Sequence, residues 1–362
     1  MKCELGTICS RLSSGKNIPA KFVCSQGKYP VYGGNGLRGY TDTYNFDGEC
    51  AIIGRQGAFC GNVRYFKGTA YMTEHAVVVC ADQHNSTQYL AYLLSTMQLG
   101  RLSGQSAQPG LSVKTLSKQV VDIPSLEVQN KIAAILRSLD DKIELNNKIN
   151  ENLQQQAFAL FDKLMFDSDN TECQVSDIAY LNPKRPLSKN QVARCIDMSQ
   201  LSTTGAFPSG WEMKPFTGGM RFTNGDTLLA RITPCLENGK TAFIDFLNKD
   251  EVAFGSTEYI VLAPKEGIPA EFLYCLARYP AFVDYAVKNM NGSSGRQRVS
   301  AETIGKFVLP EVSKSDLSVF GTNVTPMFRK MRCNFFENLR LAAIRDTLLP
   351  KLMNGEIDVD GI

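Results

Sequence analysis

The stretch IAAILRSLDDKIELNNKINENLQQQAFALFDKL, residues 132–164, decides the fold of this 362-residue chain. Apolar residues and two asparagines recur in it at alternating steps of four and three positions. That spacing aligns one face of an α-helix along its whole length and is typical of a coiled-coil seam. A helix of about 40 residues is ~60 Å long at ~1.5 Å per residue. The seam consists of Ile132, Leu136, Leu139, Ile143, Asn146, Asn150, Leu153, Ala157, Leu160 and Leu164.

The pattern occurs a second time, because residues 104–164 recur at 292–352 with a constant offset of 188 residues. Two prolines in the second copy, Pro326 and Pro350, predict that its helix kinks or restarts near residue 326 and ends by Gly355. The second seam consists of Phe320, Val324, Met327, Met331, Asn334, Asn338, Leu341, Arg345, Leu348 and Leu352. Matched pairs before the helices are Gly104 and Gly292, Ser106 and Ser294, Ser112 and Ser300, and Thr115 and Thr303.

Four asparagines interrupt the two apolar seams at equivalent positions. Ordinary amphipathic packing explains one such stripe alone, but buried asparagines are costly unless they pair, and two stripes share the same register. We therefore expect them to face one another between antiparallel helices, with charges such as Asp140 and Lys148 on solvated faces. The predicted helix-pairing residues are Ile132, Leu136, Leu139, Ile143, Asn146, Asn150, Leu153, Leu160, Asn334, Asn338, Leu341 and Leu348.

The sequence outside the two helices predicts two globular α+β domains. Each domain is followed by one long helix, so the chain is predicted to be an internal pseudo-twofold repeat. Short apolar runs at 50–53, 76–79, 227–230 and 259–262 favour strands, and 88–97 and 269–278 favour helices. CEL at 3–5 is similar to CQV at 173–175, and TEH at 73–75 to TEY at 257–259. The predicted organisation is a domain over 1–123, a central helix over 124–167, a domain over 168–312, a distal helix over 313–355 and a tail over 356–362.

Composition narrows the class of protein. The net charge of +3 does not by itself indicate a nucleic-acid binder, so a DNA ligand requires local clusters of basic residues. Eleven scattered cysteines and two histidines support neither a metal site nor a disulfide framework. The sequence shows no membrane-length apolar run and no signal peptide, so we expect a cytoplasmic protein.

No paired nucleophile and base is visible, and we expect no catalytic residue in this chain. Basic and polar residues on glycine-punctuated stretches remain as candidates for contacting base edges, since Arg and Gln can bond guanine and adenine bidentately. A solvated surface or a local salt bridge explains any single one of them equally well. The candidates are Asn35, Arg38, Tyr40, Arg55, Gln56, Arg64, Arg221, Arg231, Lys240, Ser293, Ser294, Arg296, Gln297 and Arg298.

Several stretches together resemble the specificity subunit of type I restriction-modification systems over nearly the whole chain. YPVYGGNG at 29–36, GYTD at 39–42 and GRQGAFCGNV at 54–63 look like one of this family's target recognition domains, and LLARITP at 228–234 with GSSGRQR at 292–298 like another subtype. IPSLEVQNKIA at 123–133 looks like the start of its central helix, and RDTLLPKLMNGEI at 345–357 is similar to its C-terminal signature. EVSKSD at 311–316 departs from the family's usual glutamine-bearing opening of the distal helix.

The resemblance implies a non-catalytic reader of double-stranded DNA. Each recognition domain would read one half of a split target, and the helices would set the spacing and dock two methyltransferase subunits. S-adenosylmethionine, ATP and Mg then belong to those partners and to restriction subunits where these exist, not to this chain. A free-standing DNA-binding or scaffold protein with the same architecture remains the alternative at this stage.

Overall fold

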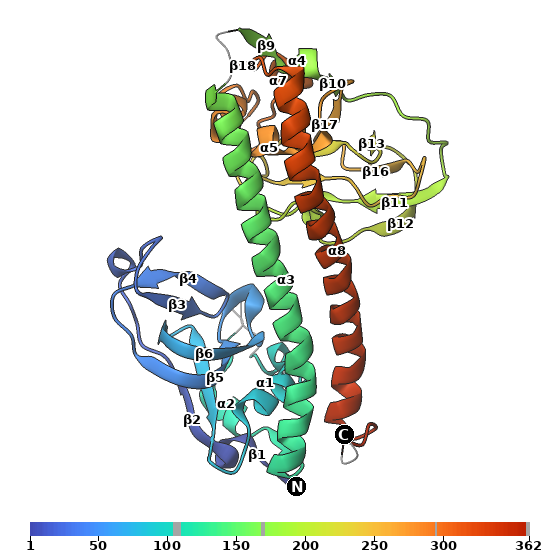
Figure 1. The fold of residues 1–362 in the computed structure, drawn as a ribbon. Coiled ribbons are helices and arrows are strands. Elements are labelled where there is room, and N and C mark those ends of the chain that lie inside the picture. Colours follow the sequence, from blue (N-terminus) through green and yellow to red (C-terminus); the bar gives the residue numbers. More distant parts are fainter. Residues whose placement is uncertain (104–109, 168–170, 294, 360–362) are drawn as a thin grey trace. The chain divides into compact units, whose positions relative to one another are not determined.

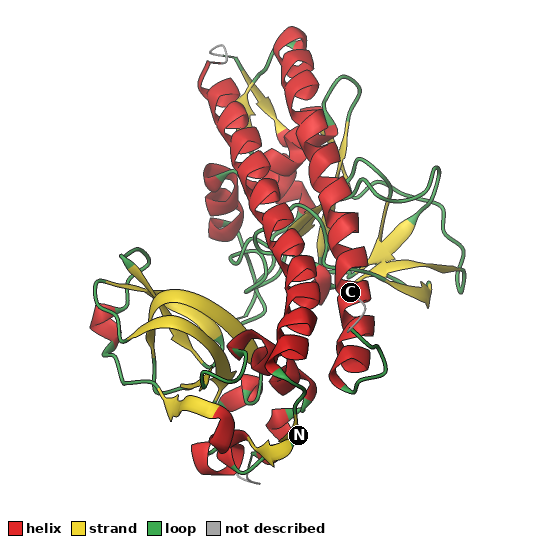
Figure 2. Cartoon of the chain, turned by 60° about the horizontal axis from the view of Figure 1, so that its bottom comes forward, coloured by secondary structure: helices red, strands yellow, loops and turns green. Residues whose placement is uncertain are grey.

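The computed structural model describes residues 1–103, 110–167, 171–293 and 295–359. By its internal contacts the chain divides into two compact units: unit 1 contains 1–142 and 341–362, and unit 2 contains 143–340. Strands and short helices form the globular part of each unit, and long helices run through both (Figure 2). In the described parts, no helix is both long and apolar enough to cross a membrane.

Unit 1 is built on one six-stranded sheet in the order β2-β7-β5-β6-β3-β4 (Figure 1). Its neighbours pair antiparallel except β3 and β6, which are parallel. The strands are β2 (Cys9–Ser14), β3 (Tyr29–Gly33), β4 (Gly36–Thr41), β5 (Phe46–Gly54), β6 (Val63–Met72) and β7 (Ala76–Ala81). The helix α1 (Thr87–Thr96) packs its buried residues into the same apolar core as β5 and β7.

Unit 2 contains two four-stranded sheets, ordered β10-β17-β14-β15 and β12-β11-β16-β13. The first consists of β10 (Ala179–Leu181), β14 (Thr227–Ala230), β15 (Thr241–Phe243) and β17 (Tyr259–Pro264). The second consists of β11 (Val192–Ile196), β12 (Glu212–Pro215), β13 (Met220–Phe222) and β16 (Ala253–Gly255). Its globular part also contains the helices α4 (Val175–Ile178), α5 (Ala270–Arg278) and α6 (Pro280–Lys288). The predicted strands at 50–53, 76–79, 227–230 and 259–262 and both predicted short helices are confirmed.

The repeat seen in the sequence is a repeat of structure. Helix α2 (Val113–Ser117) in unit 1 and α7 (Ala301–Gly305) in unit 2 start at equivalent serines, each of which accepts a hydrogen bond from the threonine amide three residues on. Each helix leads into a short strand, β8 (Val120–Asp122) or β18 (Val308–Pro310). These strands pair antiparallel with β1 (Lys2–Glu4) and β9 (Glu172–Gln174), so the resemblance between CEL and CQV marks equivalent strands.

The two long helices are α3 (Leu126–Asp167, 42 residues) and α8 (Lys314–Met353, 40 residues). Ser313 caps α8 by accepting a hydrogen bond from the Asp316 amide, so the departure from the family pattern at 311–316 still forms an ordinary helix start. The expected restart near residue 326 is wrong, because α8 continues as one helix through Pro326. The reason is packing: Val324 and Phe328, on either side of that proline, are fully buried.

Within unit 2 the asparagines of the two seams pair across the helices. The amide of Asn146 donates to Asn338 at 2.9 Å, and that of Asn334 donates to Asn150 at 2.8 Å. Residue numbers rise along one helix as they fall along the other, which shows that the helices run antiparallel there. Asn146 and Asn334 are almost completely buried, so these hydrogen bonds offset much of the cost of placing amides in an apolar seam.

Candidate nucleic-acid interface

An arginine ends the central strand of unit 1. Arg55 follows β5 directly, and its backbone is held on both sides: its amide donates to the carbonyl of His75 at 3.0 Å, and its carbonyl accepts from the amide of Leu111 at 2.8 Å. The Arg55 side chain is half-buried, and its guanidinium lies 3.4 Å from the hydroxyl of Ser14. Its place at the edge of the sheet is therefore fixed by the main chain.

Unit 2 repeats this arrangement around Arg231, which follows β14. Its amide donates to the carbonyl of Glu258 at 3.0 Å, and its carbonyl accepts from the amide of Val299 at 3.0 Å. Val299 stands at the repeat position of Leu111. The similar stretches TEH and TEY supply the other partner, through His75 in unit 1 and through Glu258, one position earlier in its stretch, in unit 2. Arg55 and Arg231 are thus structurally equivalent, although the sequences around them differ.

Other candidates in unit 1 gather at the same edge. A turn at 33–36 joins β3 to β4, and a Cβ added at Gly34 would lie 3.4 Å from the amide nitrogen of Arg55. A Cβ added at Gly36 would lie 3.0 Å from the guanidinium carbon of Arg64. The tip of the hairpin, with exposed Asn35, therefore reaches the end of β5 and the start of β6.

Three further candidates differ in their surroundings. The exposed side chain of Arg38 lies over Gly33 near the hairpin tip. The exposed Gln56 lies beside Arg55, and its side-chain oxygen is 3.1 Å from a ring nitrogen of His75. Tyr40 stands apart from this edge, at the far end of β4, where its backbone pairs with that of Cys24.

In unit 2 the structure gives several candidates partners within the chain. Arg298 forms a bidentate ion pair with Glu258, with nitrogen-to-oxygen distances of 2.8 to 3.0 Å. The ammonium of Lys240 donates to the carbonyl of Met198 at 2.7 Å. Arg221 lies in β13, in the second sheet of unit 2, and its guanidinium is 5.7 Å from the ring centroid of Phe216. The alternative of a local contact therefore holds for these residues, while their contact with DNA stays a prediction.

The segment 291–298 presents the other candidates of unit 2. Ser293 and Arg296 are exposed, and Gln297 is half-buried with its carbonyl accepting from the Thr233 amide. Ser294 lies outside the described residues, as do Gly104 and residues 105–108 of the matching stretch in unit 1. Within the described parts, Arg296 has no ion pair, which distinguishes it from Arg298.

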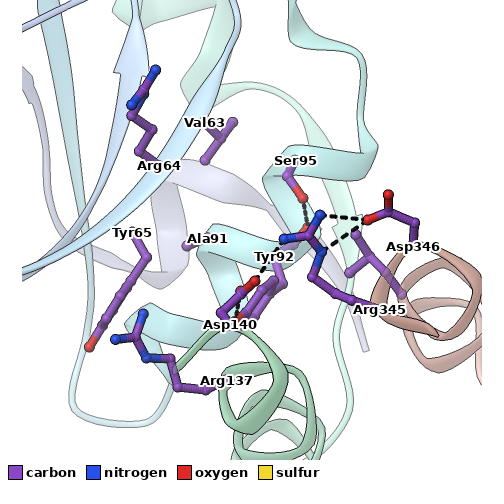
Figure 3. Close-up of a pocket in the computed structure, with 11 residues that line it drawn as sticks. Val63, Arg64, Tyr65, Ala91, Tyr92, Ser95, Arg137, Asp140, Arg345 and Asp346 are labelled. Carbon is purple, nitrogen blue, oxygen red and sulfur yellow. Dashed lines mark hydrogen bonds and ion pairs between the residues drawn. The ribbon is translucent and has the colours of Figure 1, made fainter. Parts of the chain in front are cut away.

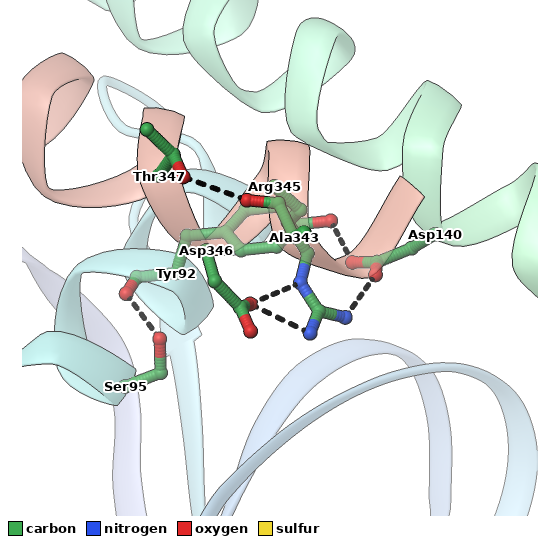
Figure 4. Close-up of polar contacts among 7 residues, drawn as sticks. All are labelled: Tyr92, Ser95, Asp140, Ala343, Arg345, Asp346 and Thr347. Atoms are coloured by element: carbon green, nitrogen blue, oxygen red, sulfur yellow. Dashed lines mark hydrogen bonds and ion pairs between the residues drawn. The ribbon is translucent and has the colours of Figure 1, made fainter. Parts of the chain in front are cut away.

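A polar cluster in unit 1 was missed by the sequence reasoning, which placed Asp140 on a solvated face. Asp140 is only 25% exposed and pairs with Arg345 of α8 at 2.7 Å, and the hydroxyl of Tyr92 donates to its other oxygen at 2.5 Å (Figure 4). Arg345 also contacts Asp346 at 2.8 Å. The one sequence feature that points to this cluster is the apolar face of α1. Packing of that face places Tyr92 of α1 beside Asp140 of α3.

Beside this cluster lies a cavity of about 440 Å³, lined by arginines as well as acids (Figure 3). Arg64 of β6 contributes to it, and the guanidinium of Arg137 lies 5.5 Å from the ring centroid of Tyr65. Burial and the hydrogen bond to Asp140 raise the pKa of Tyr92 far above its ordinary value, so that hydroxyl stays a donor. The cluster thus ties α1, α3 and α8 together within unit 1.

A buried glutamine performs a related task at the start of α3. The side-chain oxygen of Gln129 accepts from the Ser86 amide at 2.9 Å, and its nitrogen donates to Asn85 and to the carbonyl of Pro124. Ser86 is the residue that caps α1. Leu317 occupies the repeat position in α8 and is buried, so the second half replaces this polar joint by an apolar contact.

Known proteins resemble this chain in sequence over part or most of its length. Residues 1–155 match the model of the type I restriction modification DNA specificity domain. The chain is 41% identical over 145 residues to the type I restriction enzyme EcoprrI specificity subunit of Escherichia coli, a match that covers 39% of this chain and 35% of that relative. It is 27% identical over 330 residues to the HindI specificity subunit of Haemophilus influenzae, covering 69% and 71% of the two chains.

A solved structure shares the fold. The crystal structure of the type I restriction-modification S subunit from M. genitalium aligns with a TM-score of 0.64 at 18% identity, covering 97% of this chain and 95% of that one. The duplicated α+β units, the paired long helices and the sequence matches agree with one another. The chain is thus similar to specificity subunits of type I restriction-modification systems, in sequence over part of its length and in fold over nearly all of it.

Proposed function

We propose that this protein reads a split, asymmetric double-stranded DNA target, one half with each globular part. The observation that carries the proposal is the equivalence of Arg55 and Arg231. Both end a central strand, and both are held through the backbone by matching segments, yet the residues around them differ. Two similar frames with different surfaces suit the reading of two different half-sites.

Base-edge contacts must supply much of the selectivity, because the net charge of +3 provides little general attraction to phosphates. Arginine bonds guanine bidentately in the major groove, and glutamine bonds adenine in the same manner. The cluster of Arg38, Arg55, Gln56 and Arg64 supports such a role in unit 1. In unit 2 the exposed side chain of Arg296 supports a contact with DNA.

The partners that fit this chain are two methyltransferase subunits docked on the paired helices. In this proposal they carry S-adenosylmethionine and methylate the DNA, and restriction subunits, where present, carry ATP and Mg. The specificity subunit itself performs no catalysis and works in the cytoplasm, where its DNA target lies. A test of the non-catalytic assignment is direct: the isolated chain, supplied with S-adenosylmethionine and target DNA, should transfer no methyl group, and transfer would overturn it.

The main experiment expresses the chain with the methyltransferase encoded beside it and maps adenine methylation on genomic DNA by single-molecule sequencing. We expect a two-part motif with a fixed gap. Arg55→Ala should relax one half of that motif and Arg231→Ala the other, whereas Lys249→Ala, an exposed lysine of unit 2, should alter neither. Absence of any motif, with the methyltransferase bound and active, would favour a free-standing or scaffold protein instead.

A further inference from the structure

Arg298 has already committed its guanidinium to contacts within the chain. Its Nε donates to both carboxylate oxygens of Glu258, at 3.0 and 2.9 Å, and one terminal nitrogen donates to the same carboxylate at 2.8 Å. The other terminal nitrogen donates to the carbonyl of Arg296 at 3.1 Å. All three nitrogen atoms of this side chain therefore donate hydrogen bonds within the protein.

These contacts stand at the base of the segment that carries Arg296. The amide of Arg298 donates to the carbonyl of Asn291 and that of Asn291 to the carbonyl of Arg298, both at 2.9 Å. Glu258 also accepts the amide of Arg231 through its backbone carbonyl. Glu258 thus connects Arg231, at the end of β14, to Arg298, where the segment 291–298 is closed by its backbone hydrogen bonds to Asn291.

We propose that Glu258 and Arg298 are positioning residues that set the direction of Arg296, and that Arg296 makes the DNA contact in this segment. This inference rests on the function proposed above and assigns different roles to two neighbouring arginines. A bidentate carboxylate–guanidinium pair fixes both distance and orientation, which a single hydrogen bond does not. Because the pair also holds the Arg296 carbonyl, loss of the pair releases the backbone from which the Arg296 side chain projects.

Unit 1 lacks this device. The repeat position of Arg298 is Gly110. The counterpart of Glu258 in the similar stretches TEY and TEH is Glu74, whose carboxylate lies 3.1 Å from a ring nitrogen of His75. The proposal therefore concerns one half-site only. Variants of the pair should change the motif read by unit 2 and leave the motif read by unit 1 unchanged.

The test uses the complex with its methyltransferase and measures DNA affinity against salt concentration together with the methylation motif. Removal of a residue that contacts a phosphate lowers the slope of log affinity against log salt by about 1. We expect Arg296→Ala to lower the slope by that amount. Glu258→Gln should leave the slope unchanged and relax one half-site by about tenfold. The exchange of the pair, Glu258→Arg with Arg298→Glu, should restore part of the selectivity, because the ion pair re-forms while the hydrogen bond to the Arg296 carbonyl does not.

The exchange is the decisive variant, because a glutamate at position 298 can rebuild the pair but cannot contact a phosphate. Glu302→Gln, which alters an exposed ion pair with Lys306 nearby, serves as the control and should change neither quantity. If Arg298→Ala lowers the slope as Arg296→Ala does, and the exchange restores nothing, Arg298 contacts DNA and the proposal is wrong. Absence of a two-part motif in the unmutated complex would instead overturn the proposed function, so the two failures are distinguishable.

Discussion

At the scale of single residues, the two units solve the same packing problem with different chemistry. In unit 1 Asp140 of α3 meets Arg345 of α8 and the hydroxyl of Tyr92. The repeat positions of Asp140 and Arg345 in unit 2 are Phe328 and Ala157, both fully buried. The ring of Phe328 lies 5.4 Å from that of Tyr274 on α5, the helix that corresponds to α1.

Removal of the Asp140 carboxylate should weaken unit 1. Asp140→Ala leaves the Tyr92 hydroxyl and part of the Arg345 guanidinium without a partner in a half-buried site, which costs about 2 kcal/mol of the free energy of unfolding. Asp141→Ala, which alters an exposed pair with Arg137, should cost less than about 0.5 kcal/mol. Equal effects of the two substitutions would show that the cluster contributes nothing specific.

The location of the effect can be measured as well as its size. Hydrogen exchange of α1 should rise in Asp140→Ala, because Tyr92 ties that helix to α3. The single tryptophan, Trp211, lies in unit 2 and stacks on Phe246 with ring centroids 5.2 Å apart. Its fluorescence transition in urea should therefore stay unchanged in this variant.

At the scale of elements, the buried asparagines make the pairing of the long helices less stable but fix its register. The apolar seams supply most of the burial, while the asparagines pair only incompletely, because the side-chain oxygens of Asn146 and Asn334 are buried without a hydrogen-bond partner in the described parts. Such groups destabilise a seam but penalise any shifted register, in which the amides would lose their bonds as well.

This argument predicts a non-additive pair of substitutions in unit 2. Asn334→Leu alone deprives Asn150 of its hydrogen bond and should cost about 1 kcal/mol. The double variant Asn150→Leu with Asn334→Leu should regain that loss, since no amide remains in the seam at this level. Trp211 fluorescence in urea measures both, and strictly additive free energies would contradict the pairing.

At the scale of the whole molecule, each compact unit takes part of both helices. The divisions fall between residues 142 and 143 in α3 and between 340 and 341 in α8. These differ from the predicted boundaries at 123, 167 and 312, which follow the sequence pattern of the elements. The contacts instead join each globular part to the helix turns that complete its core, such as Leu136 and Leu352 in unit 1.

The divisions tell where the proposed spacing can be changed without damage. Seven residues inserted after Lys142, with seven matching residues before Leu341, preserve the helical register and the contacts inside each unit. We expect the unread gap of the methylation motif to lengthen while both half-sites stay the same. Insertion in α3 alone should disrupt the helix pairing and abolish methylation. An unchanged gap in the doubly extended protein would refute the role of the helices in spacing.

The sequence by itself determined the long helices, the duplication and the strands with apolar runs, because these depend on periodicity over a few neighbouring residues. The strands at 227–230 and 259–262 and the helix at 88–97 needed no knowledge of what they pack against. The same periodicity predicted that the asparagines lie in the seam, because they occur at equivalent positions in both copies of the repeat. Local sequence also identified Arg55 and Arg231 as candidates, because each closely follows an apolar run that forms a strand.

Only the tertiary structure decided the partners of charged side chains. Asp140 and Arg345 are far apart in the sequence, as are Glu258 and Arg298, and a charge carries no periodic signature of its partner. The parallel pairs β3–β6 and β11–β16 are equally invisible to local patterns, because they depend on how distant segments pack. Which arginines hold the protein together and which are left exposed is therefore settled by long-range packing.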